Sequence, residues 1–333
     1  VVTHAKFQVV DLPGTGPIGL ITLDNGFDHT KPNTFGPKGL LELSAALDAA
    51  EAADIKALAV TGKPFIFAVG ADLTGVPIIT SREMALGIAK LGHHVLRRFT
   101  DFKVPTFALI NGAAMGGGLE VALHCNYRTI SSGAAAIALP ECFLGLVPGW
   151  GGAYLLPNLI GPQKALQVIV TNPLAQNRML KPRQVLDLGI ADAIFEPADF
   201  IEQSLGWASD VLAGDIVVAR PEIARDESWD QAVAAVRAGL DAQLHGAAPA
   251  PVRAVDLVAA AKTADADTAF AAEDEALADL IMSDQLRAGL YSFDLVQKRA
   301  KRPVGAPDKS LARPVTKVGI VGLSTFMALD EVD

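Results

Sequence analysis

The sequence has little cysteine, no excess of positive charge and no long uninterrupted apolar helix, and each absence excludes a class of protein. Its two cysteines, Cys125 and Cys142, cannot form a disulfide framework, which indicates a reducing compartment, and we expect a cytoplasmic protein. The formal net charge of −9 disfavours nucleic acid as a partner. The longest uncharged run, residues 142–163, contains five Gly and three Pro and is therefore unsuited to a membrane-spanning helix.

What is present is typical of a globular α/β protein with a large core. Half of the 333 residues are apolar and a fifth are charged. Strand-like and helix-like periodicities alternate through the first 200 residues, which favours a layered α/β structure with functional loops at the carboxyl ends of strands. The predicted strands are residues 6–12, 17–23, 55–62 and 104–110, and the predicted helices are residues 38–53, 81–99 and a segment that begins near Gly117.

Two glycine-rich loops follow strand-like segments and carry the first chemical signal. They are PFIFAVGADL (64–73) and INGAAMGGGLEVALHC (110–125). Three consecutive glycines at the start of a helix leave backbone N–H groups open to a phosphate or a developing oxyanion. The alternative is that these glycines only permit tight packing of the helix on the sheet.

Two carboxylates lie close to these loops in the sequence. Glu120 falls in the first turn of the helix after the glycines, and Glu141 lies in LPECFLGLVPGWGG (139–152). Apolar surroundings should raise the pKa of Glu141, which suits proton transfer near neutral pH. Taken alone, Glu141 is equally a structural carboxylate or a catalyst. The histidines have no metal-ligand spacing, so we expect no metal, and His93 and His94 are interpreted as surface or core residues.

Together, the segments FAVGAD, NGAAMGGGLE and PECFLGLVPGWGG resemble the enoyl-CoA hydratase/isomerase (crotonase) family over residues 5–200. The resemblance implies a crotonase-like ββα spiral core in residues 1–200, followed by a mostly helical region in residues 201–303. It implies that the backbone N–H groups of Val69 and Gly117 form an oxyanion hole for a thioester. It also implies that Glu120 activates a water molecule and that Glu141 delivers a proton to C2 of the substrate.

The same resemblance implies further contacts with an acyl-CoA substrate and no separate cofactor. Trp150 is interpreted either as a substrate contact or as an aromatic anchor of its loop, and Asp72 as a structural partner within the substrate loop. The usual sequence of the CoA-binding loop is altered in KPNTF (31–35). The implied substrate-binding residues are Gly70, Ala71, Asp72, Gly116 and Trp150, together with Pro32, Asn33 and Thr34 of that altered loop.

The function implied is the hydration of 2-enoyl-CoA to 3-hydroxyacyl-CoA in fatty-acid β-oxidation. Isomerisation of Δ3- to Δ2-enoyl-CoA at the same site is the alternative within the family, and it needs only one carboxylate. A non-catalytic role as an assembly partner of a thiolase subunit is the alternative from another class. The resemblance also implies either a trimer or hexamer of this chain or assembly with a thiolase.

The last third of the chain departs from a single-function hydratase. Residues 231–280 contain 19 alanines among 50 residues and predict helices. Residues 272–303 resemble the helical linker of the multifunctional fatty-acid oxidation enzymes, and we expect two helices there to pack on the hydratase core near the acyl pocket. Residues 304–333 predict an extended linker and then a strand, TKVGIVG (316–322), similar to the first strand of a dehydrogenase domain.

That strand does not continue into a dinucleotide-binding motif. The Gly-x-Gly-x-x-Gly fingerprint fails because Ser324 stands where the second glycine is required. Few residues follow before Asp333, too few for a βαβ unit. We therefore expect no NAD binding and interpret the sequence as resembling the hydratase half of a multifunctional α-chain, either truncated or read out of frame near residue 323.

Overall fold

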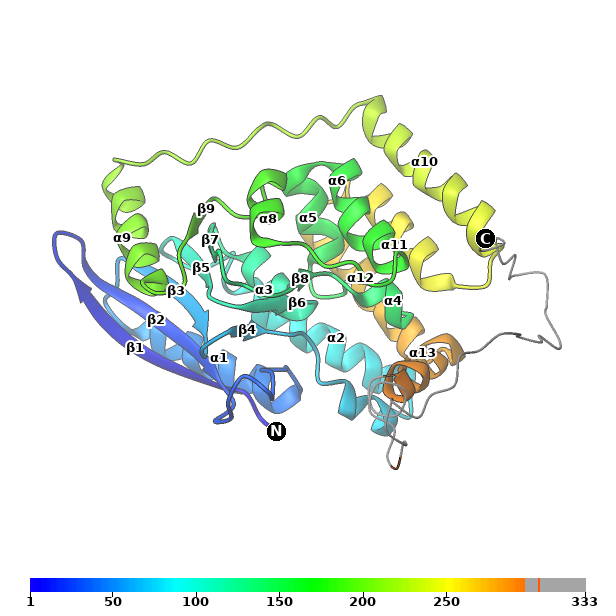
Figure 1. Cartoon of the computed structure of the whole chain (residues 1–333), viewed down its shortest axis with the longest axis horizontal. Coiled ribbons are helices and arrows are strands. Elements are labelled where there is room, and N and C mark those ends of the chain that lie inside the picture. Colours follow the sequence, from blue (N-terminus) through cyan, green and yellow to red (C-terminus); the bar gives the residue numbers. More distant parts are fainter. Residues whose placement is uncertain (297–304, 306–333) are drawn as a thin grey trace. The chain divides into compact units, whose positions relative to one another are not determined.

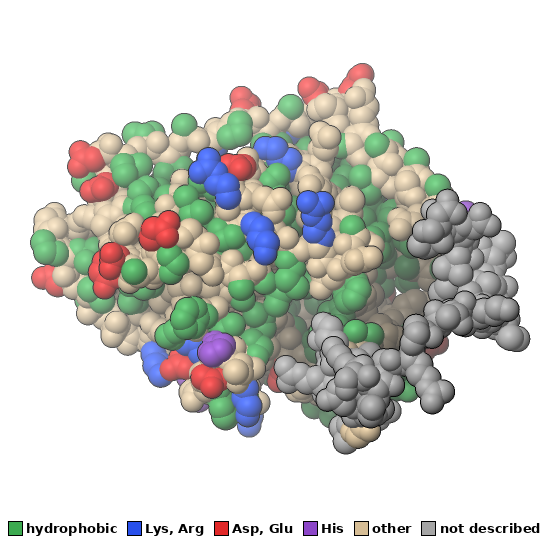
Figure 2. All heavy atoms as spheres, in the orientation of Figure 1, with side chains coloured by type: hydrophobic (Ala, Val, Ile, Leu, Met, Phe, Trp, Pro, Cys, Tyr) green, Lys and Arg blue, Asp and Glu red, His purple; other side chains and the backbone are tan. Residues whose placement is uncertain are grey.

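The computed structural model describes residues 1–296 and residue 305. The chain divides into two compact units, Val1–Leu290 and Tyr291–Asp333, and the candidate site lies wholly in the first. Among the described residues, no helix combines the length and apolar character that crossing a bilayer requires. On the face shown in Figure 2, acidic and basic side chains are interspersed among neutral and apolar ones.

Two sheets organise the first unit (Figure 1). The larger has the order β1-β2-β3-β5-β7-β9, in which β1 is antiparallel to β2 and all other neighbours are parallel. The smaller has the order β4-β6-β8 and is parallel throughout. The strands are β1 (His4–Leu12), β2 (Gly16–Asp24), β3 (Ala57–Gly62), β4 (Ile66–Ala68), β5 (Thr106–Ile110), β6 (Ala113–Met115), β7 (Tyr127–Ser131), β8 (Ile137–Ala138) and β9 (Ala193–Phe195).

A ββα unit repeats three times along the chain. A strand of the large sheet (β3, β5 or β7) is followed by a strand of the small sheet (β4, β6 or β8) and then by a helix: α2 (Arg82–Arg97), α3 (Gly117–His124) or α4 (Glu141–Leu144). This arrangement confirms the predicted crotonase-like α/β fold. Because β4, β6 and β8 are parallel neighbours, the three sequence motifs that follow them meet at one edge of the small sheet.

Burial explains why these segments form strands and helices where they do. Every residue of β3 and of β5 is buried, as expected for central parallel strands covered on both faces. The edge strand β1 instead alternates between exposed and half-buried positions. In α1 (Pro37–Ala52), Leu40, Leu43 and Leu47 recur at helical spacing and are fully buried, so the apolar stripe predicted there is confirmed.

The alanine-rich region is helical, as predicted, but it is not separate from the core. Side chains of α10 (Glu227–Leu244), α11 (Pro249–Ala260) and α12 (Ala266–Ile281) belong to the same buried cluster as those of β3, β5 and α3. The unit therefore continues across the predicted boundary at residue 200, because these helices bury their apolar faces against the ββα core. The remaining helices are α5 (Gly152–Ile160), α6 (Pro162–Leu166), α7 (Asn172–Leu174), α8 (Pro182–Leu188), α9 (Phe200–Ala213) and α13 (Asp284–Asp294), with the short turns η1 (Leu73–Ile78) and η2 (Gln167–Thr171).

The two helices predicted within residues 272–303 correspond to the end of α12 and to α13. α12 packs along α2, and its apolar residues Ala276, Leu277, Leu280 and Ile281 are buried, which confirms the predicted docking for this part. In α13 the predicted burial is confirmed for Leu286, and Leu290 is half-buried against the same core, whereas the prediction was wrong for Phe293 and Val296, which are 37% and 49% exposed. The predicted linker and the strand TKVGIVG lie outside the described residues, apart from Gly305.

Candidate active site

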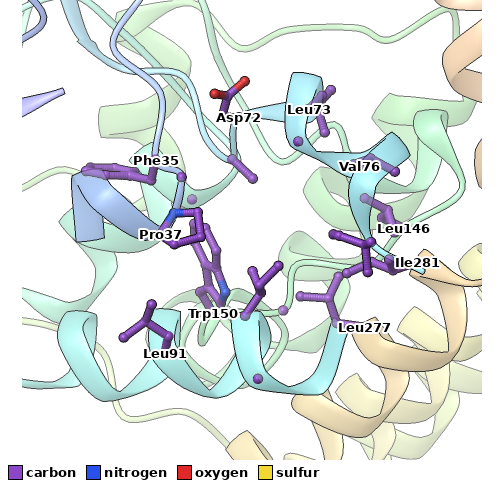
Figure 3. Close-up of a pocket in the computed structure, with 18 of the residues that line it drawn as sticks. Phe35, Pro37, Asp72, Leu73, Val76, Leu91, Leu146, Trp150, Leu277 and Ile281 are labelled. Atoms are coloured by element: carbon purple, nitrogen blue, oxygen red, sulfur yellow. The ribbon is translucent and has the colours of Figure 1, made fainter. Parts of the chain in front are cut away.

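An apolar cavity of about 460 Å³ lies where the three motifs meet. Its wall is formed by the segment that leads into α1, by η1, by α2, by the start of α3 and by residues 146–150. Figure 3 shows Leu277 and Ile281 of α12 completing the wall opposite Phe35 and Pro37. Three acidic side chains line this otherwise apolar surface, namely Asp72, Glu120 and Glu141. The cavity therefore fits an apolar group whose reactive end meets carboxylates.

Glu120 is buried in the first turn of α3 and is held by backbone donors. Its Oε1 accepts hydrogen bonds from the N–H groups of Trp150 (2.8 Å) and Gly152 (2.9 Å). Burial, with the nearby charge of Glu273, raises the pKa of Glu120 to about 7, while the two N–H donors act in the opposite direction. A carboxylate with this pKa can accept a proton near neutral pH.

Glu141 begins α4 and faces the same cavity without a committed partner. Its Oε2 is buried and accepts no hydrogen bond from any described residue. Burial, followed by the proximity of Glu120, raises the pKa of Glu141 well above its ordinary value. Near neutral pH this pair accordingly favours a protonated Glu141 beside an ionised Glu120, since like charges in one cavity disfavour double ionisation.

Glycine is required in the two glycine-rich loops, at Gly70 and at Gly116–Gly118, because a side chain there would collide with neighbouring atoms. A Cβ on Gly116 would lie 2.6 Å from Oε1 of Glu141, and the residue has φ +52°. A Cβ on Gly117 would lie 2.5 Å from the Trp150 ring, and one on Gly118 would lie 2.0 Å from the Ala68 carbonyl oxygen. Gly70 (φ +85°) approaches the backbone of Gly117 in the same way. Gly70 and Gly116 thus bring the loops together rather than lining the cavity.

The structure corrects the prediction that Val69 supplies an oxyanion donor. The Val69 N–H already donates to the Asn33 carbonyl oxygen at 2.8 Å, and Val69 does not line the cavity. Ala71, two residues after Val69, forms a parallel β-bridge with Phe35. In this bridge the Phe35 N–H donates to the Gly70 carbonyl oxygen and the Asp72 N–H donates to the Phe35 carbonyl oxygen. The Ala71 N–H therefore points away from Phe35. Ala71 lines the cavity. Its N–H therefore replaces that of Val69 as the candidate donor.

Gly117 is the second candidate donor, as predicted, and it also lines the cavity. As the first residue of α3, it has an N–H with no acceptor inside the helix, and the helix dipole makes this end favourable for negative charge. The Ala71 and Gly117 donors come from the two glycine-rich loops, which meet because β4 and β6 pair in parallel. The arrangement can stabilise a developing oxyanion.

The KPNTF segment serves the fold more than the cavity. Asn33 is fully buried: its amide donates to the carbonyl oxygens of Leu23 (2.8 Å) and Phe67 (3.2 Å), so the predicted substrate contact is wrong for this residue. Pro32 is exposed and Thr34 is half-buried, and neither lines the cavity. The wall begins just beyond them, at Phe35, Gly36 and Pro37.

Trp150 and Asp72 have roles both in the cavity and in the local fold. The Trp150 ring lines the cavity and packs so closely on α2 that a Cβ on Gly92 would lie 2.1 Å from its Nε1. Asp72 lies at the rim (Figure 3), and its carboxylate caps η1 by accepting from the Thr74 N–H at 3.1 Å. This capping matches the structural role expected for Asp72.

Sequence reasoning missed a buried acidic residue behind the cavity and underrated a histidine. Glu273 of α12 accepts hydrogen bonds from the N–H groups of Gly151 (2.6 Å) and Tyr154 (2.8 Å). His93, interpreted as a surface or core residue, contacts Glu273 through Nε2 (3.1 Å) and Asp274 through Nδ1 (2.6 Å). The signal available was an adjacent pair of acids on the buried face of a predicted helix.

Comparison with known proteins agrees with this geometry. Residues 15–251 match the enoyl-CoA hydratase/isomerase family. The chain is 30% identical over 320 residues to a fatty acid oxidation complex subunit alpha of Shewanella loihica, covering 92% of this chain and 43% of that protein. It is 33% identical over 284 residues to the human peroxisomal bifunctional enzyme, covering 82% of this chain and 36% of that protein. The chain thus spans less than half the length of these curated relatives.

Solved structures show the same fold. Human mitochondrial delta3-delta2-enoyl-CoA isomerase superposes with a TM-score of 0.61 at 21% identity, covering 89% of this chain and 99% of the isomerase. The family match extends to residue 251 and so includes α10, beyond the predicted limit near residue 200. From the ββα repeat, the paired glutamates and the extent of this match, the chain belongs to the enoyl-CoA hydratase/isomerase family.

Proposed function

We propose that the protein hydrates 2-enoyl-CoA thioesters to 3-hydroxyacyl-CoA, as a step of fatty-acid β-oxidation. The observation that carries the proposal is the pairing of Glu120 and Glu141 at one end of an apolar cavity, beside the N–H groups of Ala71 and Gly117. The named relatives in fatty-acid oxidation support the pathway. The acyl chain would occupy the apolar part of the cavity.

The reaction adds the elements of water across the C2–C3 double bond. The thioester oxygen accepts hydrogen bonds from Ala71 and Gly117, so that negative charge can accumulate on it as a nucleophile attacks C3. The ionised Glu120 takes a proton from the attacking water, whose oxygen bonds to C3. The protonated Glu141 delivers its proton to C2, and the balance of protons is restored when Glu120 returns one to Glu141.

The electrostatics support this division of roles. Glu120 has two backbone donors that favour its charged form, whereas Glu141 has a buried, unpartnered Oε2 that favours the neutral form. A base needs the first environment and an acid the second. Two donors preorganised for the oxyanion stabilise the transition state without reorganisation, and losing one such donor costs about 3–4 kcal/mol in comparable sites.

Isomerisation of Δ3- to Δ2-enoyl-CoA is the second candidate for the same cavity. It needs one carboxylate to move a proton between carbons, and the uncommitted Oε2 of Glu141 favours that residue for the task. Hydration uses both carboxylates. The two activities therefore separate in a Glu120→Gln variant, which should lose hydration and retain more of any isomerisation.

The test is the loss of absorbance of the conjugated enoyl thioester when the purified chain meets crotonyl-CoA and longer homologues, with Δ3-enoyl-CoA in a parallel assay. Hydration that depends on both Glu120 and Glu141 supports the proposal. An absence of turnover with intact folding would favour a non-catalytic role, such as assembly with a thiolase subunit. Sedimentation of the chain alone and with a thiolase would test the proposed oligomer or complex.

A further inference from the structure

A buried acid–histidine cluster lies behind the cavity, and the proposed reaction does not use it. It consists of Glu273 and Asp274 of α12 and His93 of α2, which are 0%, 6% and 5% exposed. Burying ionisable groups is costly unless they are paired and hydrogen-bonded. His93 bridges the two acids, so the cluster is internally paired. Its position relative to Glu120 indicates a use beyond packing.

Glu273 and Glu120 are held by one backbone turn. The turn comprises residues 150–154 at the start of α5. The N–H groups of Trp150 (2.8 Å) and Gly152 (2.9 Å) donate to the Glu120 carboxylate. Those of Gly151 (2.6 Å) and Tyr154 (2.8 Å) donate to the Glu273 carboxylate. The donors to the two carboxylates alternate along the chain, so neither set can move without the other.

Gly151 is the pivot of this turn. Its φ of +109° is open to glycine and strained for other residues, and a Cβ there would lie 2.7 Å from Nε2 of His124. His124 fixes the other side of the turn by donating from Nε2 to the Trp150 carbonyl oxygen at 2.9 Å. The turn is therefore clamped by α3 on one side and by α12 on the other.

We propose that Glu273, held in place by His93, is a positioning residue for Glu120: it fixes the turn of residues 150–154 whose N–H groups hold the Glu120 carboxylate. This inference rests on the proposed function, in which Glu120 is the base. Glu273 does not line the cavity and so acts through the backbone and through its charge. His93 orients Glu273, because it bonds the same Oε2 that accepts from Gly151.

The charges of Glu273 and His93 shift the pKa of Glu120 in opposite directions. Burial opposes the charge of His93, but its bonds to Asp274 and Glu273 raise its pKa to about 9, so it is a cation at neutral pH. The charge of Glu273 raises the pKa of Glu120, and the charge of His93 lowers it. Removing either charge should therefore move the Glu120 titration in a direction fixed by the sign of the charge removed.

Other ionisable groups lie on the helices packed around the cluster. His124 of α3 is neutral, because burial lowers its pKa to about 3. Glu141 of α4 lines the same cavity as Glu120, and its own pKa is raised by burial. α5 contributes Tyr154, which donates its N–H. Further out, a surface depression beside His93 is lined by Lys90, His94, Arg97, Arg98, Asp101 and Asp267. The variants compared below leave these surrounding groups unchanged, so a difference between the variants reports the substituted residue.

The experiment measures the Glu120 titration directly, in the full chain labelled with ¹³C at the Glu carboxyl carbon, with Glu120→Gln identifying the resonance. Glu273→Gln should lower the pKa of Glu120, and His93→Gln should raise it, each by roughly 0.5–1 unit. Glu275→Gln is the matched control: this exposed α12 carboxylate pairs with Arg82 and should leave the titration unchanged. If Glu273→Gln does not fold, His93→Gln carries the test.

The hydration assay gives the second readout. Glu273→Ala leaves the Gly151 and Tyr154 N–H groups without their acceptor and should lower kcat about tenfold with little change in KM, because the base is misplaced while the acyl cavity is intact. Glu273→Gln keeps an acceptor oxygen and removes the charge, so the acid limb of its pH profile should move to lower pH, and that of His93→Gln to higher pH. If the variants melt at lower temperature but leave the Glu120 titration and the pH profile unmoved, the cluster only joins α12 to α2 and the proposal is wrong. If the titration shifts as expected while wild-type protein hydrates nothing, the coupling of the cluster to the Glu120 carboxylate stands and the proposed function fails.

Discussion

Leu277 offers a test of whether α12 is part of the substrate cavity. This residue lines the cavity, is 8% exposed, and lies so close to the loop of residues 146–150 that a Cβ on Gly149 would be 2.7 Å from its Cδ2. Leu277→Ala removes three carbon atoms from the wall. The space left could hold up to three methylene groups of a longer acyl chain, and the burial of each contributes about 0.8 kcal/mol to binding. The upper limit is about 2.4 kcal/mol, or about 50-fold, and partial relaxation of α12 should reduce it to about tenfold. We expect the ratio of kcat/KM for octenoyl-CoA to that for crotonyl-CoA to rise by this factor.

The matched control is Leu280→Ala on the same helix. Leu280 is 5% exposed but does not line the cavity, so its loss should cost stability, about 2–5 kcal/mol, without changing the preference for chain length. The assay is the loss of enoyl absorbance for a series of acyl lengths, with thermal melting of both variants. If both variants change the ratio equally, or if Leu277→Ala leaves it unchanged, α12 does not shape the acyl site.

Three further predictions follow from the site. Gly116→Ala should displace Glu141 and lower kcat about 100-fold, because the new Cβ would lie 2.6 Å from Oε1 of Glu141 and the residue has a φ of +52°. Gly206→Ala in α9 is the control: nothing lies within 4 Å of its Cβ, so kcat should be unchanged. The pH dependence of kcat should be bell-shaped: activity rises as Glu120 ionises near its pKa of about 7 and falls at higher pH as Glu141 loses its proton; a flat profile from pH 5 to 9 would refute the assigned roles. The chain should not bind NAD, because Ser324 breaks the dinucleotide fingerprint; a micromolar isotherm in calorimetric titration would refute this.

The sequence predicted those parts of the site that depend on local pattern. Glu120, Glu141 and Gly117 lie on one cavity because each follows a strand of the same small sheet, an outcome that the α/β alternation and the motifs already indicated. The strands β1, β2, β3 and β5 and the helices α1, α2 and α3 were predicted for the same reason, whereas the short strands of the small sheet were not. Hydrophobic period and glycine position are properties of short segments.

The errors fall where the outcome depends on partners distant in the chain. Val69 could not be excluded as a donor from its motif alone, because its acceptor is the Asn33 carbonyl oxygen, 36 positions earlier. The Asn33 amide donates to the carbonyl oxygens of Leu23 and Phe67, which lie 10 and 34 positions away in the chain. Glu273 was missed because its donors, Gly151 and Tyr154, lie more than 100 residues away. Tertiary hydrogen bonds of this kind leave no periodic signal in a single sequence.

The most direct test of the central claim is the hydration of crotonyl-CoA by the wild-type chain and by Glu120→Gln and Glu141→Gln, followed by the loss of absorbance at the enoyl thioester. Both variants keep the size of the side chain, and melting temperatures establish that they fold. Wild-type protein should catalyse hydration, and each variant should lower kcat at least 100-fold with a modest change in KM, since general acid–base catalysis contributes about 10²–10⁴. Absence of hydration by the folded wild-type chain, or near-wild-type kcat in either variant, would contradict the assignment of these two glutamates as the base and the acid.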